Sequence, residues 1–132
     1  MDIKTHKEIQ TVFNEPTLDI NAGIEISGDE DFFIRTLSKI VKSDLHRMIE
    51  SIRSTMPKDN KQFYAAAHSL KGASSYAGCT RIHKISESLQ TCAEQKNYGL
   101  AVPLFNELVN EVKEVQKKYV EYLKSKGRES NV

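Results

Sequence analysis

The most informative part of the sequence is Ala67-His68-Ser69-Leu70-Lys71-Gly72-Ala73-Ser74-Ser75-Tyr76-Ala77-Gly78. Its small and apolar residues recur at steps of three and four, which is typical of a helix that buries one side against a neighbour. We predict a helix over residues 61–76, capped by Asp59 or Asn60 and ended at Gly78. The residues expected on its buried side are Phe63, Ala66, Ala67, Leu70, Ala73 and Ala77.

On this helix His68 is expected to point outward, with Lys71, Gly72 and Ser75 on the same side. A glycine inside a helix costs about 1 kcal/mol relative to alanine, so Gly72 needs a reason. One reason is access: the absent side chain leaves the imidazole open, and Lys71 places a positive charge beside it. Such an imidazole suits a nucleophile that takes up a phosphoryl group. The alternatives are that Gly72 permits close helix packing and that His68 is an ordinary surface residue.

Three further segments have helical periodicity. Ser27 and Glu30 have the spacing of a capping box at the start of a helix of about 26 residues. Another helix is predicted over residues 80–96, and a last one from near Leu100 with Pro103 in its first turn. The residues expected to be buried are Ile34, Leu37, Val41, Leu45, Met48 and Ile52 in the first of these helices, Ile82, Ile85, Leu89 and Cys92 in the second, and Ala101, Phe105, Leu108, Val112, Val115, Tyr119 and Tyr122 in the last.

Four amphipathic helices joined by short loops predict an all-α, up-down-up-down four-helix bundle. One or two short helices, at Thr5–Phe13 and Asn21–Ile26, are expected to cover one end of it. The predicted organisation is an N-terminal segment over residues 1–28, the bundle over 29–124, and a polar tail over 125–132.

The composition is that of an ordinary globular domain. The 132 residues carry a net charge of +1, whereas a general nucleic-acid binder would show a large basic excess. No apolar run is long enough to span a membrane, and the start has no signal-peptide pattern, so we expect a cytoplasmic protein. Charge is uneven, with a net −6 over residues 1–31 and +7 over the rest. The simplest interpretation is an acidic segment that contacts a basic body; the alternative is a surface shaped for a partner.

Other kinds of chemistry find little support in the sequence. Cys79 and Cys92 have no metal-ligand spacing and are too far apart along one helix for a disulfide, so we expect two reduced thiols. There is no phosphate-binding glycine loop and no Ser-His-Asp arrangement. A metal-binding bundle would need inward Glu and His residues, but the inward stripes are apolar. We therefore expect neither a cofactor nor a metal of the protein's own.

The run His68-Ser69-Leu70-Lys71-Gly72, with Ser74-Ser75 and Gly78 after it, resembles the signature of histidine-containing phosphotransfer (HPt) domains. The stretch from Leu18 to Phe33 also resembles the approach to the first long helix in that family. The similarity extends over roughly residues 18–124 and places the motif on the second long helix of a four-helix pattern. The resemblance implies a bundle that relays phosphoryl groups between receiver domains.

The resemblance also implies roles for particular residues. His68 is expected to carry the phosphoryl group on Nε2, Lys71 to help neutralise its oxygens, and Gly72 to give steric access. Gln90, on the third long helix, falls where some family members place a glutamine beside the histidine. It is expected either to donate a hydrogen bond there or to be an ordinary solvated residue.

The expected partners are receiver domains of response regulators and a hybrid sensor histidine kinase, with Mg²⁺ supplied by the receiver. Docking needs small and apolar residues around the histidine. The candidates are Tyr64, Ser69, Ser75 and Tyr76 on the same helix and Ile9, Phe13 and Ile24 from the N-terminal segments. For the last three, the alternative is that they cover the bundle's own core. We expect a monomer.

The predicted function is that of a phosphocarrier, which accepts the group on His68 and passes it on, without kinase or hydrolase turnover of its own. The rival hypothesis is a helical adaptor, a pseudo-HPt protein that binds receivers or kinases without phosphotransfer. Such proteins usually lose the histidine, whereas this chain has His68 with Lys71 and Gly72.

Overall fold

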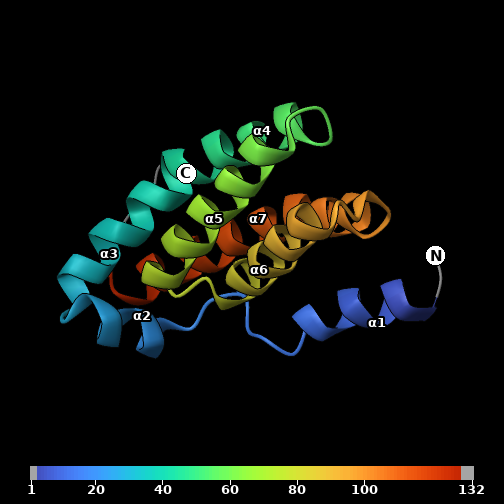
Figure 1. Ribbon diagram of the computed structural model, residues 1–132. Coiled ribbons are helices and arrows are strands. Elements are labelled where there is room, and N and C mark those ends of the chain that lie inside the picture. Colours follow the sequence, from blue (N-terminus) through green and yellow to red (C-terminus); the bar gives the residue numbers. More distant parts are fainter. Residues whose placement is uncertain (1–2, 129–132) are drawn as a thin grey trace.

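The computed structural model describes residues 3–128, and that part of the chain contains helices and no strand (Figure 1). The predicted all-α class is therefore confirmed. The elements in chain order are α1 (Ile3–Val12), α2 (Ile20–Ser27), α3 (Glu30–Lys39), the π-helical turn η1 (Ile40–Asp44), α4 (Leu45–Thr55), α5 (Asn60–Tyr76), α6 (Thr80–Gln95) and α7 (Tyr98–Ser125).

The long helices pack side by side around one core. Helix α5 packs against α4 and α6, and α6 packs against α7 (Figure 1). Helix α7 also meets the first long helical segment, since the Ser38 and Tyr119 hydroxyls hydrogen-bond at 2.7 Å and the rings of Phe33 and Tyr122 lie 6.0 Å apart. The largest fully buried side chains come from all of these helices: Tyr119, Phe33, Phe63, Leu37, Leu45, Ile52, Leu70, Ile82, Ile85, Leu89, Leu104 and Leu108.

The sequence predicts one continuous α-helix for the first long segment, but the structure interrupts it. A π-helical turn separates α3 from α4, and the N–H of Leu45 donates to the carbonyl of Ile40. The Ser43 hydroxyl donates to the Lys39 carbonyl at 2.9 Å and so occupies an acceptor of the regular ladder. The buried stripe nevertheless holds across the turn, except that Met48 is only half-buried.

The predicted capping box at Ser27 is wrong. Helix α2 runs through Ser27, and Gly28 ends it in the left-handed region at φ 93°. Helix α3 is instead capped by Asp29, whose side chain accepts from the N–H of Phe32 at 2.7 Å. An aspartate caps as well as a serine, so sequence spacing alone did not separate the two.

The last helix begins earlier than predicted. Asn97 caps it, accepting from the N–H of Leu100 at 3.2 Å, and Tyr98 and Gly99 are already helical. Pro103 therefore lies beyond the first turn, where its missing N–H leaves one carbonyl of the helix without its usual donor. The other predicted bounds agree with the structure to within a residue or two: α5 is capped by Asp59, and α6 ends at Gln95.

Both short N-terminal helices are present, but they do not share one end of the molecule. Helix α2 packs on α3 and α5, whereas α1 lies along α6 and α7 (Figure 1). The segment before α2 is held by Asp19, whose N–H donates to the Gly78 carbonyl at 2.7 Å. Glycine is required at position 78 for two reasons: a side chain would collide with the Asp19 carbonyl, and φ is +69°, in the left-handed region.

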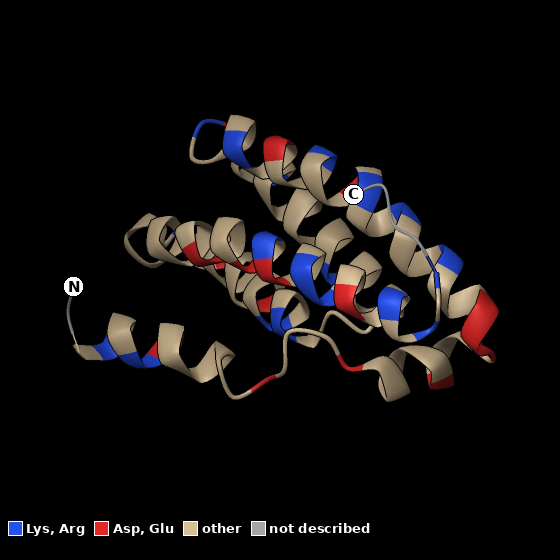
Figure 2. Ribbon diagram, turned by 180° about the vertical axis from the view of Figure 1, so that it is seen from behind, with Lys and Arg blue, Asp and Glu red and all other residues tan. Residues whose placement is uncertain are grey.

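Part of the acidic N-terminal region contacts basic residues, as the simpler interpretation of the charge pattern predicts. Lys126 pairs with Glu30 at 3.3 Å and Arg128 pairs with Asp31 at 2.9 Å. In Figure 2 the acidic start of α3 lies near the basic segment that follows α7. The predicted polar tail is thus tied down at its beginning, and its residues 129–132 lie outside the described part of the chain.

Cys79 and Cys92 are both buried and unpaired, as predicted. Burial raises the pKa of Cys79 to about 12 and that of Cys92 to about 11, so neither is a reactive thiolate at neutral pH. None of the helices in residues 3–128 has the length and apolar character needed to cross a membrane.

Candidate functional site

Helix α5 has one buried side and one bare side. Phe63, Ala67, Leu70 and Ser74 are buried against the neighbouring helices, and the Ser74 hydroxyl donates to the Leu70 carbonyl at 2.7 Å. His68 lies on the opposite side and is exposed. The sequence-based expectation of an outward histidine is therefore met by the geometry.

Gly72 lies one turn after His68, and its surroundings separate the two reasons for a glycine there. A Cβ atom built on Gly72 would have no atom within 4 Å. A glycine that permits close helix packing would show the opposite, as Gly23 does, where a Cβ would overlap the ring of Phe33. Packing within this chain therefore does not explain why position 72 is a glycine. The missing side chain leaves open space beside the histidine.

His68 and Gly72 line an open depression of about 350 Å³. Its wall combines the α5 side with residues from α2 and α6, and its rim carries two exposed apolar side chains, Ile26 and Tyr76, which are 49% and 61% exposed. The residues that line it are Ile26, His68, Lys71, Gly72, Ser75, Tyr76 and His83. A depression with an imidazole and an ammonium inside and apolar residues at the rim can receive an anionic group carried by a partner protein.

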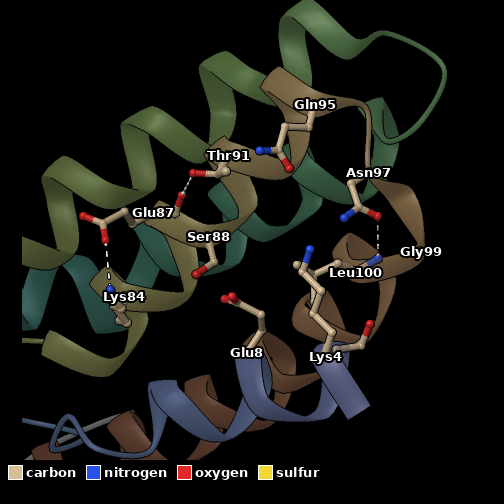
Figure 3. Close-up of a pocket in the computed structure, with 11 residues that line it drawn as sticks. Lys4, Glu8, Lys84, Glu87, Ser88, Thr91, Gln95, Asn97, Gly99 and Leu100 are labelled. Atoms are coloured by element: carbon tan, nitrogen blue, oxygen red, sulfur yellow. Dashed lines mark hydrogen bonds and ion pairs between the residues drawn. The ribbon is translucent and has the colours of Figure 1, made fainter. Parts of the chain in front are cut away.

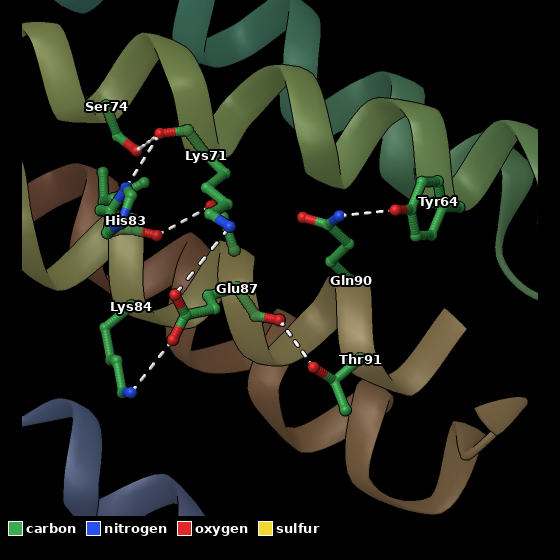
Figure 4. Close-up of polar contacts among 10 residues, drawn as sticks. Tyr64, Lys71, Ser74, His83, Lys84, Glu87, Gln90 and Thr91 are labelled. Atoms are coloured by element: carbon green, nitrogen blue, oxygen red, sulfur yellow. Dashed lines mark hydrogen bonds and ion pairs between the residues drawn. The ribbon is translucent and has the colours of Figure 1, made fainter. Parts of the chain in front are cut away.

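Lys71 is half-buried and faces α6, where it meets Glu87 (Figure 4). Its Nζ lies 3.9 Å from one carboxylate oxygen of Glu87, and Lys84 lies 3.1 Å from the other. The hydrogen bond from Lys84, together with the charges of Lys84, Lys71 and His83, lowers the pKa of Glu87 against a smaller effect of burial. Lys71 is thus beside the site, but its charge is shared with a carboxylate.

Gln90 does not hydrogen-bond to the histidine. Its Nε2 donates to the Tyr64 hydroxyl at 2.8 Å, as Figure 4 shows, and the Tyr64 ring is stacked parallel to that of His68, with centroids 6.3 Å apart. Gln90 therefore reaches His68 through Tyr64. Its buried Oε1 has no hydrogen-bond partner within residues 3–128.

The other predicted docking residues fall into two groups. Tyr64, Ser75 and Tyr76 surround the histidine, and Ser69 is exposed on the same helix. The N-terminal candidates lie elsewhere. Ile9 is buried in the core and is corrected from a docking residue to a core residue, because α1 uses it to pack on the long helices. Ile24 packs partly buried against the same core.

Phe13 is 49% exposed, but the guanidinium of Arg81 covers its ring at 4.9 Å. It lines a different hollow, together with Pro103 and Glu107, that contains none of the residues around His68. The structure therefore does not bring Phe13 to the candidate site.

Three residues of the site were missed in the sequence: Ile26, His83 and Glu87. Helices α5 and α6 form a hairpin whose turn is centred on Ala77, so residues equally distant from Ala77 face each other. That register pairs Lys71 with His83 and Tyr64 with Gln90, as the hydrogen bonds show. Counting outward from the turn would have placed His83 beside Lys71; nothing comparable distinguishes Ile26 from Ile24.

A larger hollow, of about 770 Å³, lies between α1 and the α6–α7 connection. In Figure 3, Lys4 and Glu8 of α1 face Ser88 and Thr91 of α6 across it. Its lining mixes charges of both signs and holds no histidine or cysteine. Residues 3–128 contain no group of three or more side chains suited to hold a metal ion. The depression at His68 is the better candidate site, because it alone of the two presents an exposed imidazole.

Comparisons with known proteins give the family of the chain and a similar relative. The model of the Hpt domain family matches residues 36–118. The chain is also similar to the phosphorelay intermediate protein rdeA of Dictyostelium discoideum, with 29% identity over 90 residues. That match covers 68% of this chain and 35% of the relative, so the chain spans about a third of that protein's length. No solved structure gives a significant match.

Proposed function

The chain belongs to the Hpt domain family, and from that premise we propose that it is a phosphorelay intermediate whose His68 accepts and passes on a phosphoryl group. The observation that carries the proposal is the exposed imidazole of His68 beside the empty space at Gly72. The name of the Dictyostelium relative, a phosphorelay intermediate, supports the same role.

The proposed step is an in-line transfer from a receiver. The Nε2 lone pair of neutral His68 attacks the phosphorus of an aspartyl phosphate, and the bond from phosphorus to the carboxylate oxygen breaks. The carboxylate leaves with the electron pair. Histidine suits this step because a fair fraction of its side chains carries the lone pair at neutral pH. In the second half of the relay, an aspartate of another receiver attacks the phosphohistidine in the reverse sense.

Lys71 is proposed to neutralise part of the phosphoryl charge. Its ion pair with Glu87 spans 3.9 Å, and both side chains are partly exposed at 34% and 45%. An exposed pair of this kind is worth at most about 1 kcal/mol, so an incoming dianion can draw the ammonium toward itself. Mg²⁺ and most of the transition-state stabilisation are assigned to the receiver.

The scaffold proposed for this function is an up-down-up-down four-helix bundle made of the α3–η1–α4 segment, α5, α6 and α7. Sequential packing of these segments and the contacts of α7 with Ser38 and Phe33 support it. A rigid bundle keeps the ring in place, and the rim residues Ile26 and Tyr76 are proposed to pack against the receivers or the hybrid sensor kinase that the protein serves.

The proposal is tested by incubating the protein with phosphorylated receiver domains and following the label. We expect acid-labile, base-stable label on the wild type and none on His68→Gln. His46→Gln is the matched control, because His46 is an exposed histidine of α4 whose contact is Gln116 of α7. Equal labelling of His68→Gln would overturn the site. Tight receiver binding with no transfer would favour the adaptor function.

A further inference from the structure

We infer that His83 is a second imidazole of the phosphoryl site, and that its Nε2–H donates a hydrogen bond to the phosphoryl group carried by His68. This assignment rests on the proposed function. His83 was not among the residues singled out by the sequence motif. The assignment rests on the hydrogen bond that orients its ring and on the depression that it shares with His68.

The ring of His83 is oriented by the backbone of α5. His83 lies in the first turn of α6, directly after the tight connection at Gly78, and its Nδ1 is 3.0 Å from the Lys71 carbonyl oxygen (Figure 4). A carbonyl oxygen only accepts, so Nδ1 must carry the proton and donate it. The same carbonyl accepts from the Ser74 hydroxyl at 3.1 Å, which makes this a well-defined contact between the two helices.

With Nδ1 used in this way, the functional end of the ring is Nε2. Within residues 3–128 no hydrogen-bond partner engages that nitrogen. His83 also lines the depression that contains His68 and Gly72. The structure therefore brings a second imidazole, with one nitrogen committed and one unengaged, to the space where a phosphoryl group on His68 would lie.

The charged groups that face His83 are Glu87 and Lys84 of α6 and Lys71 of α5. The contribution of α2 at this point, Ile26, is apolar. In the proposed step the ring takes up a proton from solvent as the phosphoryl dianion arrives, so that N–H is present at both of its nitrogens.

The assignment also answers a need of the site. A transferred phosphoryl group has three oxygens, and Lys71 is a single point charge that it shares with Glu87. A second donor from α6 would hold an oxygen that Lys71 cannot reach. Hydrogen bonds to charged groups are about twice as strong as neutral ones, so one such bond matters to the phosphorylated state.

Two substitutions separate this role from a merely structural one. His83→Asn keeps an amide N–H near the position of Nδ1, so the bond to the Lys71 carbonyl can remain, but it removes Nε2. His83→Gln places its amide N–H near the position of Nε2 and gives up the bond to the carbonyl. His46→Asn, on α4, serves as the control.

The measurement is the equilibrium constant for transfer from a phosphorylated receiver to the full chain. We expect His83→Asn to lower it by roughly tenfold, because the variant keeps the bond to the Lys71 carbonyl but has no donor at the position of Nε2. His83→Gln should retain more of the wild-type constant, because its amide N–H lies near that position. In the wild type, the ¹⁵N resonance of His83 Nε2 should move when His68 is phosphorylated.

The opposite order, with His83→Gln impaired and His83→Asn like the wild type, would overturn the assignment and leave His83 a structural residue. So would equal constants for all variants. Failure of the proposed function looks different, because the wild type itself would then take up no label on His68. Thermal unfolding of both variants checks that each is folded.

Discussion

Two regions at the hairpin of α5 and α6 each contain glycines and an ion pair, but the two regions use them in opposite ways. In the anchor region, made of Gly23, Gly78, Arg81 and Glu111, the space is filled. A Cβ at Gly23 would overlap Phe33, and one at Gly78 would meet the Asp19 carbonyl. In the proposed phosphoryl site, made of His68, Lys71, Gly72, His83 and Glu87, the space beside Gly72 is empty. Glycine permits packing in the first region and leaves room in the second.

The ion pairs of the two regions differ in the same sense. Arg81 and Glu111 lie 3.3 Å apart with 19% and 4% of their side chains exposed, and Arg81 also donates to the Glu15 carbonyl and the Thr17 hydroxyl. Lys71 and Glu87 lie 3.9 Å apart and are partly exposed. The charged groups of the anchor region are satisfied within the chain, whereas the proposed phosphoryl site has open space and a partly exposed ammonium that a group from outside could engage.

The largest effect is expected in the anchor region. Arg81→Met leaves the Glu111 carboxylate, one of whose oxygens already has no partner within residues 3–128, buried without a counter-charge. We expect the free energy of unfolding to fall by about 3 kcal/mol, measured by urea denaturation. Lys118→Met, which removes the exposed partner of Glu121, is the control and should change little.

The pH dependence of this loss is also predictable. Burial raises the pKa of Glu111, while Thr17 and Arg81 oppose the shift. Without Arg81 the pKa should rise further, so the folded variant binds a proton that the unfolded chain releases. Its stability should therefore recover as pH falls from neutral toward the carboxyl's ordinary range. A loss that is constant over this pH interval would contradict the buried-charge explanation.

The next effect concerns the open space itself. Gly72→Gln should slow phosphotransfer from a receiver by about 10²-fold, because a long side chain one turn from His68 obstructs the approach of the reacting group. Gly72→Ala should leave transfer near the wild-type rate, since a Cβ there touches nothing. If Gly72→Gln transfers as fast as Gly72→Ala, the access explanation for this glycine is wrong.

Gly23 in α2 and Gly72 in α5 should respond to alanine with opposite signs. At Gly23 the methyl group meets the fully buried Phe33 ring, so Gly23→Ala should lower the free energy of unfolding by about 2 kcal/mol. Gly72→Ala should raise it by up to about 1 kcal/mol through helix propensity. Urea denaturation of the pair measures both, and a destabilised Gly72→Ala would remove the contrast between the regions.

The smallest effect is expected for the exposed ion pair. Because Lys84 lowers the pKa of Glu87, the folded state is stabilised by the ionised carboxylate at neutral pH and loses that contribution as pH falls through the carboxyl range. Glu87→Gln should cost only a few tenths of a kcal/mol at neutral pH, after allowance for solvent screening, and nothing in acid. A cost well above 1 kcal/mol would mean that the pair is as tightly held as that of the anchor region.

Sequence periodicity was sufficient for the all-α class, the main helices and the exposure of His68, because burial on a helix follows directly from spacing. It was insufficient where two choices are physically similar. Serine and aspartate are both good helix caps, so the sequence did not separate Ser27 from Asp29. The run Asn97-Tyr98-Gly99 suits a break as well as a helix start, and the π-turn at Ile40 depends on whether the N–H of Leu45 donates to the carbonyl of Ile40 or to that of Val41.

Residues brought together by packing were harder to foresee than residues on one helix. Lys71, Gly72 and Ser75 follow from their spacing to His68, and the structure places all three in the depression. His83 reaches it only through the register of α5 against α6, and the same register brings Glu87 to Lys71 at its side. Ile9, Ile24 and Ile26 are indistinguishable by spacing, yet Ile9 is buried, Ile24 is half-buried and Ile26 forms the rim.

The central claim is that the phosphoryl group is carried by His68 in its open position on α5. The most direct measurement is NMR of the ¹⁵N-labelled protein after incubation with a phosphorylated receiver, at alkaline pH, where phosphohistidine persists. The account predicts a phosphorus–nitrogen bond at Nε2 of His68 and at no other imidazole. A phosphorylated nitrogen on His6, His46 or His83, or unchanged histidine resonances with an active receiver, would contradict it.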